Sequence, residues 1–496
     1  MIVEELATQI MQTFGFVPTA DQAVATAVFS RFLLDRDGSS VMIMRGSAGT
    51  GKTSLAAAIV KTLVKLRQKV ILLAPTGRAA KVFSVNAGRP AFTIHRRIYR
   101  QKTFAGESTG FSLNDNMYHD TLFIVDEASM IANGGGGEGA VFGTGCLLDD
   151  MVSFVYGGHN CRMMIIGDMA QLPPVGEEES PALMSGFMAG YGLKVYQCDL
   201  NEILRQASGS GILYNATEIR RMITHDEVTR LPKITFSGFA DIRMVPGGEL
   251  IEQLNSSYGE VGIDETIVIT RSNKRANAYN AGIRGTVLGR EEELTTGDML
   301  MVVRNNYYWI EKAIAEEKAL DENSKDNGDG EKAESHALPF IANGDRASVV
   351  RVRNVREIYG LHFADVWLQF PDYDNYEIMV TAITDSLMAE APALTREQSE
   401  RLFNGVMEDY KDVPLKADRL KKVRQDPCYN ALQIKYAYAV TCHKAQGGQW
   451  AHIYVDQGYM TDDMLSPDYI HWLYTAFTRA TEKLFLVNWP KTQTEG

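Results

Sequence analysis

The chain has 496 residues, of which 45% are hydrophobic and 23% are charged, a composition that excludes a collagen-like chain, a wholly disordered chain and a small disulfide scaffold. Its 62 acidic and 50 basic side chains give a formal net charge of −12. This charge argues against a protein that coats nucleic acid through bulk electrostatics, although a channel lined locally with Lys and Arg remains compatible with it. A chain of this length is expected to form about two to four domains.

Cysteine usage and the N-terminal segment bear on the compartment. The five cysteines include no CxxC pair, which argues against a zinc site, and their sparse, odd number suits a reducing compartment. The first residues lack a basic segment followed by an apolar one, and no apolar run approaches eighteen residues. We therefore expect a cytoplasmic protein with no membrane partner.

Short apolar runs alternate with helical patterns in the first 200 residues. A helical stretch at 54–68 separates the first two runs, and several runs end in Gly, Pro or Asp. This rhythm predicts parallel strands joined by crossover helices, in an α/β sheet that is covered on both faces. The runs lie at 41–46, 69–75, 121–127, 161–168 and 194–200. Between the second and third runs, residues 96–119 have Gly and Ser at their centre and aromatic residues on both arms, which predicts a projecting β-hairpin.

A second set of apolar runs predicts a second α/β domain. Short β segments that alternate in places lie between 295 and 430 and predict a small β-barrel inserted into that domain. Residues 316–335 contain almost no large apolar side chains, and we expect them to form a solvated acidic excursion from the insert. The runs of the second set lie at 265–271, 436–442, 451–457 and 483–488.

The sequence GSAGTGKT at 46–53 carries the strongest chemical signal. It fits the GxxxxGK[ST] phosphate-loop pattern and lies between an expected strand and an expected helix, which is the context that this pattern requires. Lys52 should reach the β- and γ-phosphates of ATP, and the Thr53 hydroxyl should hold Mg²⁺. A glycine-rich turn without a ligand is the alternative, which the full pattern and its flanks disfavour. The predicted nucleotide-binding residues of this segment are Gly46, Ala48, Gly49, Thr50, Gly51, Lys52, Thr53 and Ser54.

Adjacent carboxylates follow the apolar run at 121–125. In a parallel sheet a carboxylate at the end of such a strand lies beside the phosphate loop. Asp126 would hold Mg²⁺ through water, and Glu127 would orient or deprotonate the attacking water. A solvated strand end is the plainer interpretation of an acidic pair, but the phosphate loop upstream favours the catalytic one.

Five further segments occur in the order found in superfamily 1 helicases. The set is most similar to the RecD and Dda branch, whose members are 5′-to-3′ DNA helicases. The resemblance covers both predicted α/β domains and, more loosely, the inserted barrel. The segments are APTGRAA (74–80), VDEASM (125–130), GDMAQLPPVG (167–176), TCHKAQGGQW (441–450) and YTAFTRA (474–480).

The resemblance implies an α/β fold with two RecA-like P-loop NTPase domains. The first would span 1–203, with the β-hairpin at about 96–119. The second would comprise 204–295 and 431–496. An SH3-like β-barrel would be inserted at 296–430, with its acidic excursion at 316–335.

The same resemblance implies further site residues. Gln171 would bond the γ-phosphate and the attacking water, and Gln22 would read the adenine edge. Arg205, in LNEILRQ, and Arg479 would approach the γ-phosphate from the second domain, Arg479 as the arginine finger. Together with Glu127, the predicted catalytic residues are Gln171, Arg205 and Arg479.

The DNA contacts implied by the resemblance follow strands of both domains. A phosphate can meet a backbone N–H or a hydroxyl at such positions. The predicted residues are Thr76, Gly77, Arg78, Thr93, His95, Thr441, His443 and Lys444. His443 could instead be a core histidine.

The sequence therefore predicts a monomeric ATP- and Mg²⁺-dependent DNA helicase that acts in replication, recombination or repair. It would bind single-stranded DNA and duplex junctions, move 5′-to-3′ and unwind duplex DNA. The alternatives are a single-stranded DNA translocase and an ATPase subunit of a recombination or repair complex without intrinsic unwinding. A small-molecule P-loop kinase is a more distant alternative, because it would not need the motifs at 436–488.

Overall fold

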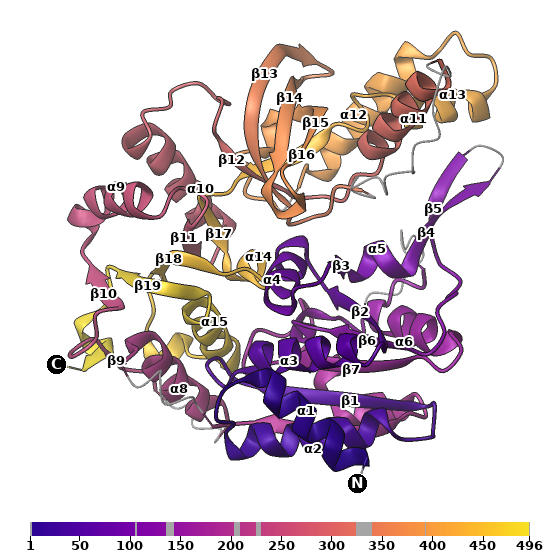
Figure 1. Cartoon of the computed structure of the whole chain (residues 1–496). Coiled ribbons are helices and arrows are strands. Elements are labelled where there is room, and N and C mark those ends of the chain that lie inside the picture. The colour runs from indigo at the N-terminus through magenta and orange to yellow at the C-terminus, as the bar shows by residue number, and fades with distance from the viewer. Residues whose placement is uncertain are drawn as a thin grey trace. The chain divides into compact units, whose positions relative to one another are not determined.

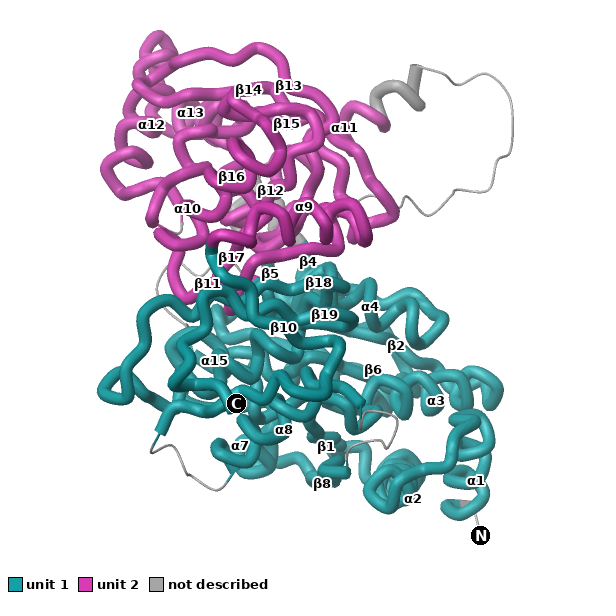
Figure 2. The backbone as a smooth tube through the Cα atoms, turned by 90° about the vertical axis from the view of Figure 1, so that its left-hand side faces the viewer, with its two compact units in different colours: residues 1–247, 445–496 teal, residues 248–444 magenta. Residues whose placement is uncertain are grey.

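The computed structural model describes residues 2–104, 107–134, 143–202, 209–224, 230–323, 340–391 and 393–495. The chain divides into two compact units (Figure 2): a first unit of residues 1–247 with 445–496, and a second unit of residues 248–444. This division differs from the three predicted domains, because the first unit also includes residues 445–496. The domain boundaries given above remain a prediction.

A six-stranded parallel sheet forms the body of the first unit (Figure 1). The strand order is β3-β2-β6-β7-β1-β8, and every neighbouring pair is parallel. The strands are β1 Ser40–Gly46, β2 Lys69–Ala74, β3 Ala91–Thr93, β6 Thr121–Val125, β7 Arg162–Gly167 and β8 Lys194–Leu200. The helices are α1 Ile2–Phe14, α2 Ala20–Leu33, α3 Lys52–Lys65, α4 Gly77–Ala87, α5 Ile94–Ile98, α6 Leu147–Gly157 and α7 Ser185–Gly190.

Both faces of this sheet are covered, as the continuous apolar runs predict. Successive side chains of a strand point to opposite faces. Met42 and Met44 of β1 belong to a core that includes residues of α1, α2 and α3, whereas Val41 and Ile43 belong to a core with residues of α5, α6 and α7. The predicted α/β class, with a parallel sheet covered on both faces, is therefore confirmed.

The remaining elements of the first unit come from distant parts of the chain. Strands β10, β19 and β18 pair in parallel in that order, and helix α8 packs against helix α15. The short strands β9 and β20 also pair in parallel. These elements are α8 Gly211–Thr224, β9 Ile234–Thr235, β10 Ile242–Val245, β18 Trp450–Asp456, α15 Pro467–Phe477, β19 Ala480–Val487 and β20 Thr494–Glu495.

The second unit contains the predicted barrel. Five strands close it in the order β12-β13-β14-β15-β16. They are β12 Met299–Val302, β13 Arg346–Ile358, β14 Leu361–Phe370, β15 Tyr376–Ile383 and β16 Leu432–Tyr436, so the closing strand lies just beyond the predicted range of 296–430. The unit also holds a parallel pair, β11 Thr266–Thr270 with β17 Ala439–Thr441. Its helices are α9 Leu250–Glu260, α10 Asn273–Gly282, α11 Tyr308–Asn323, α12 Arg396–Asp409 and α13 Lys416–Arg424, and α14 Cys442–Ala445 begins at its end.

A buried aspartate ties the start of the barrel together. Asp298 accepts hydrogen bonds from Arg284 at 2.9 and 3.0 Å, from Arg290 at 2.7 Å and from the Tyr438 hydroxyl at 2.8 Å. Burial opposes ionisation of this carboxyl, but these bonds and one from the Thr295 N–H outweigh it and lower its pKa. Two guanidinium groups thus balance a charge that would be costly alone in the interior.

Two predicted local features differ in extent from the structure. The hairpin is present as β4 Tyr99–Phe104 paired antiparallel with β5 Glu107–Leu113, but residues 96–98 belong to helix α5. The first part of the expected acidic excursion, residues 316–323, continues helix α11, because Glu, Lys, Ala and Leu favour helix. Residues 324–335 lie outside the described residues.

Among the described residues, no helix is long and apolar enough to cross a membrane. Over the same ranges, no group of three or more His, Cys, Asp and Glu side chains could hold a metal ion on its own.

Candidate nucleotide and DNA site

The phosphate loop connects β1 to α3 as predicted, and its glycines are required by the backbone. Gly49 and Gly51 adopt φ values of +78° and +79°, in the left-handed region that favours glycine. A Cβ on Gly46 would lie 2.9 Å from the Leu200 Cβ and from the Thr50 Oγ1, so the strand end has no room for a side chain.

Lys52 begins α3 and folds back over the loop. Its Nζ donates to the Gly46 carbonyl at 2.6 Å and to the Ser47 carbonyl at 2.9 Å. Gly51, the N-cap of α3, provides no side-chain cap for the first turn, which also contains Thr53 and Ser54. Backbone N–H groups at a helix N-terminus with a lysine beside them form a site suited to phosphate oxygens.

Gln22 is buried and reaches the same loop. Its Nε2 donates to the Thr50 carbonyl at 2.9 Å, and its Oε1 accepts from the Thr19 N–H at 3.0 Å. The second bond belongs to the capping box that starts α2. Both polar atoms of the Gln22 amide therefore have protein partners, and its predicted contact with adenine stays a prediction.

The acidic pair lies where β6 ends. Asp126 donates its backbone N–H to the Leu73 carbonyl of the neighbouring strand at 3.0 Å, and its side chain accepts from the Glu127 N–H at 2.8 Å. Glu127 has φ +52°, a left-handed conformation that is rare for residues other than glycine and that recurs at functional sites.

The carboxyl group of Asp126 lies beside a second acidic side chain. Burial, and then repulsion from Glu127, raise its pKa above the ordinary range, while the Glu127 N–H and Lys52 offset only part of this. A divalent cation would supply the missing positive charge. Asp126, directly or through water, and the Thr53 hydroxyl are oxygen donors of the kind that Mg²⁺ prefers, so the residues fit this ion.

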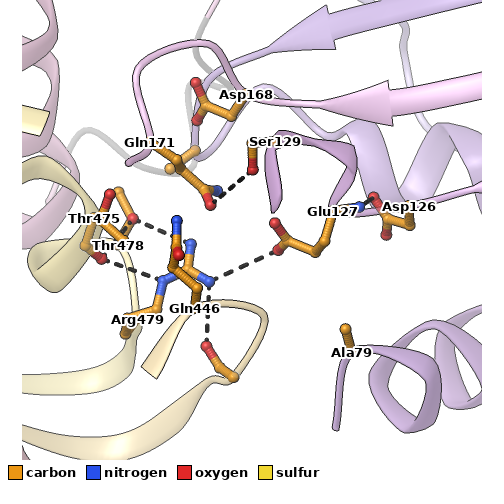
Figure 3. A network of polar contacts seen from close by, with 12 residues as sticks. Ala79, Asp126, Glu127, Ser129, Asp168, Gln171, Gln446, Thr475, Thr478 and Arg479 are labelled. Atoms are coloured by element: carbon orange, nitrogen blue, oxygen red, sulfur yellow. Dashed lines mark hydrogen bonds and ion pairs between the residues drawn. The ribbon is translucent and has the colours of Figure 1, made fainter. Parts of the chain in front are cut away.

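The loop after β7 carries the predicted γ-phosphate sensor. Gln171 is 5% exposed, and its Oε1 accepts a long hydrogen bond of 3.5 Å from the Ser129 hydroxyl, which lies just after the acidic pair. Asp168, at the start of the loop, accepts from the Ala170 N–H at 3.0 Å. Gln171 and Glu127 thus follow the ends of the adjacent parallel strands β7 and β6, and both lie near Arg479 (Figure 3).

Arg479, the predicted arginine finger, lies beside Glu127 (Figure 3), and its role at the γ-phosphate stays a prediction. It is 2% exposed, and its Nη1 lies 3.7 Å from the Glu127 Oε1. Bonds to the carbonyls of Thr475 and Gly448 at 3.2 and 3.3 Å fix the direction of the guanidinium. Arg205 lies outside the described residues.

Several residues of this site were not predicted individually. The backbone of Leu172, in the sensor loop, donates its N–H to the Thr475 Oγ1 at 2.8 Å, and its carbonyl accepts from the Gln446 Nε2 at 2.7 Å. The Tyr474 hydroxyl accepts from the Ala48 N–H at 2.9 Å and donates to Asp168 at 2.6 Å. All of these residues lie in the sequence motifs named above, so the motifs could have identified them.

One of the predicted DNA contacts, Thr76, caps helix α4. The Thr76 hydroxyl accepts from the Ala79 N–H at 3.2 Å, and Gly77 opens the helix. Arg78 donates to the Gln449 carbonyl, and its guanidinium carbon lies 4.7 Å from the centroid of the Trp450 ring. These three residues lie together at the carboxyl edge of the sheet.

Thr93 and His95 lie at the next strand end. Thr93 of β3 pairs with Ala74 of β2, and its hydroxyl caps α5 by accepting from the Arg96 N–H at 3.3 Å. Burial lowers the pKa of His95 to about 4, so this imidazole is neutral at pH 7.

The remaining predicted DNA contacts belong to the second unit. Thr441 ends β17, and His443 and Lys444 follow on α14. His443 is exposed, which rules out the core alternative for this residue. Burial, and then repulsion from Lys435, lower the pKa of Lys444 to about 8.

Comparison with known proteins supports the motif analysis. The AAA domain family matches residues 35–177, and the UvrD-like helicase C-terminal domain family matches residues 436–487. The ATP-dependent DNA helicase dda of Enterobacteria phage T4 is 27% identical over 266 residues, which cover 52% of this chain and 55% of that protein. The ATP-dependent RecD2 DNA helicase of Deinococcus radiodurans is 29% identical over 180 residues, which cover 36% of this chain and 21% of that protein.

Thus the matched region spans about half of the phage protein and a fifth of RecD2. A Bacteroides Pif1 helicase structure aligns over 97% of this chain and 95% of its own, with 14% identity and a TM-score of 0.44. The resemblance of this chain to superfamily 1 helicases of the RecD and Dda type is confirmed by these family and relative matches.

Proposed function

We propose that this chain is an ATP-dependent DNA helicase that moves 5′-to-3′ on single-stranded DNA and unwinds duplex DNA. One observation carries the proposal: Arg479 lies 3.7 Å from Glu127, within the unit that also holds the phosphate loop. An arginine beside the acidic pair supports ATP hydrolysis, because its charge could stabilise the transferred phosphoryl group. The relatives named dda and RecD2 are DNA helicases by name, which supports DNA as the substrate.

In the proposed reaction the chain's own groups divide the work. Lys52 and the N–H groups of α3 bind the phosphates, while Asp126 and Thr53 would hold Mg²⁺, which would neutralise phosphate charge. Glu127 would orient or deprotonate the attacking water. Arg479 would stabilise the charge that develops on the transferred phosphoryl group.

Hydrolysis can drive motion only if the nucleotide contacts the moving parts differently in its two states. The sensor loop provides a connection, because Leu172 is bonded to both Thr475 and Gln446. Gln171 would detect the γ-phosphate, and the loop would pass its change of position to α15. The predicted DNA residues Thr76 and Thr441 would then grip the single strand alternately.

The first experiment combines ATP hydrolysis with strand displacement. Hydrolysis is measured with and without single-stranded DNA, and displacement is measured on duplexes that carry either a 5′ or a 3′ tail. We expect DNA to stimulate hydrolysis, only the 5′-tailed duplex to open, and Lys52→Ala to abolish both activities. Opening of the 3′-tailed duplex alone would refute the proposed polarity, and hydrolysis that ignores DNA would refute the proposed substrate.

The β4–β5 hairpin is our candidate for the wedge that splits the duplex. Replacing residues 101–111 with a short turn should abolish unwinding while DNA-stimulated ATP hydrolysis persists. If unwinding survives this change, the hairpin is not the wedge. Stimulated hydrolysis without any unwinding by the unaltered chain would favour the translocase alternative.

A further inference from the structure

Arg220, on helix α8, reaches the phosphate loop from outside the recognised motifs. Its Nη1 donates to the Ser47 Oγ at 2.7 Å, and its Nη2 donates to the Asn201 side-chain carbonyl. Ser47 is the second residue of GSAGTGKT and is 4% exposed. A guanidinium group from α8 therefore fixes a buried hydroxyl of the loop that is expected to bind the nucleotide.

Neither oxygen that accepts from Arg220 carries a charge. The charge of Arg220 contributes to the lowered pKa of Asp199. However, both oxygens of the Asp199 carboxylate already accept hydrogen bonds from Arg45, at 2.6 and 3.0 Å. Neither of the two hydrogen bonds to Ser47 and Asn201 joins Arg220 to a carboxylate. The positive charge of Arg220 therefore lies beside the loop. A polyphosphate is the kind of anion that such a charge favours.

A second brace holds the next residue of the loop. The Ala48 N–H donates to the Tyr474 hydroxyl at 2.9 Å, and Tyr474 lies on α15, which packs against α8. Arg220 also influences Tyr474 electrostatically. Two consecutive loop residues are thus held by two helices that pack on each other, and Arg479 follows directly after the second helix.

We propose that Arg220 is a positioning residue for the nucleotide's phosphates and that it acts through Ser47. By fixing Ser47, it holds the loop in the shape that binds a triphosphate, and it couples α8 to the occupancy of that loop. This inference rests on the proposed ATP-dependent function. The simpler alternative is that Arg220 only fastens α8 to the first sheet.

A double-mutant cycle on Arg220 and Ser47 separates these possibilities. We measure the affinity for a fluorescent ATP analogue with Mg²⁺, and the KM and kcat for ATP. Arg220→Ala should weaken nucleotide binding and raise KM by about tenfold, which is typical for the loss of one charge-assisted hydrogen bond, with kcat within about threefold of the original value. Ser47→Ala should show a similar loss, and the double variant should lose little more, because both changes remove the same contact.

The neighbouring Arg221 provides a matched control. It lies on the same helix and pairs with Glu218 at the surface, so Arg221→Ala should leave nucleotide binding unchanged. Arg220→Lys should recover part of the loss, since an ammonium can still donate to Ser47. Thermal unfolding of each variant establishes that all are folded at the assay temperature.

Three outcomes would overturn the proposal. One is nucleotide affinity of Arg220→Ala within twofold of the original chain, and another is losses from the two single changes that simply add. The third is a lower melting temperature with an unchanged KM, which would show that Arg220 only stabilises the packing of α8. If the unaltered chain binds no ATP at all, the proposed function fails first, which is a distinguishable result.

Discussion

Two aspartates, one in each compact unit, have opposite electrostatic environments. Asp126, beside the phosphate loop, has its pKa raised by burial and by Glu127. Asp298, at the start of the barrel, has its pKa lowered despite its burial, because two arginines and a tyrosine donate to it. The barrel balances its buried charge internally, whereas Asp126 has a second carboxylate, Glu127, as its neighbour.

This difference distinguishes a structural ion pair from a reactive site. A buried charge in a core is tolerated when the surrounding groups satisfy it completely. A site that must bind a cation or stabilise a transition state keeps capacity for that partner and so remains unbalanced. Changes to the two regions should therefore affect different observables: activity at Asp126 and Arg479, and folding at Asp298.

The largest expected effect is on activity, at Arg479. Arg479→Ala should lower the rate of ATP hydrolysis by about 10³-fold or more, as for arginine fingers in other P-loop enzymes. Steady-state hydrolysis at saturating ATP measures this loss. Arg396→Ala, which removes a highly exposed arginine paired with Glu400, is the control and should change nothing. An equal loss in both variants would contradict the catalytic assignment.

The next effect is on folding, at Asp298. Asp298→Asn leaves Arg284 and Arg290 without a buried counter-charge and should lower the free energy of unfolding of the second unit by about 3–5 kcal/mol. Denaturant unfolding measures this loss. Because the folded-state pKa of Asp298 is lowered, its contribution is present above pH 3.8 and disappears as the pH falls through the lowered value. A penalty that stays constant at strongly acidic pH would show that charge is not the cause.

Asp126 should behave in the opposite way. Asp126→Asn should reduce Mg²⁺-dependent ATP hydrolysis by about 10–100-fold, the range seen when a group that orients a metal's ligands is lost. The free energy of unfolding should stay the same or rise, since the amide removes the repulsion between Asp126 and Glu127 without orphaning a bonded cation. A clear loss of stability would mean that Asp126 is a structural residue like Asp298.

The smallest expected effect is a pH dependence from Lys444. With a pKa of about 8, its ammonium is charged at pH 7 and mostly neutral at pH 9. If Lys444 binds a DNA phosphate, the affinity for single-stranded DNA should fall about threefold between pH 7 and pH 9, because roughly one phosphate contact is weakened. Lys444→Arg should remove this dependence, because arginine stays charged. If Lys444→Arg keeps the pH dependence of the original chain, Lys444 is not the source of that dependence.

Much of the fold followed from local pattern. The continuous apolar runs identified the parallel strands, since strands buried on both faces need apolar residues at every position. The chain pattern also indicated the hairpin and the barrel. It did not indicate that residues 316–323 continue helix α11, because a stretch with few large apolar residues gives little information about helix ends.

The positions of the candidate nucleotide-site residues were predictable where these residues are contiguous in the chain. Each of three segments has its polar side chains next to the end of a single strand. They are the phosphate loop, Asp126-Glu127 and the Gln171 loop. Arg479 was identified through the segment that resembles helicases. Arg220 carried no signal, because a single arginine on a helix is usually solvated and its partner Ser47 lies 173 residues away.

The sequence by itself determined which groups are present at each strand end, since backbone geometry and residue type act locally there. Only the tertiary structure decided which of these groups meet. The bonds from Arg220 to Ser47 and from Ala48 to Tyr474 join residues 173 and 426 positions apart. Such contacts depend on how whole sheets and helices pack, which is why a local pattern cannot reveal them.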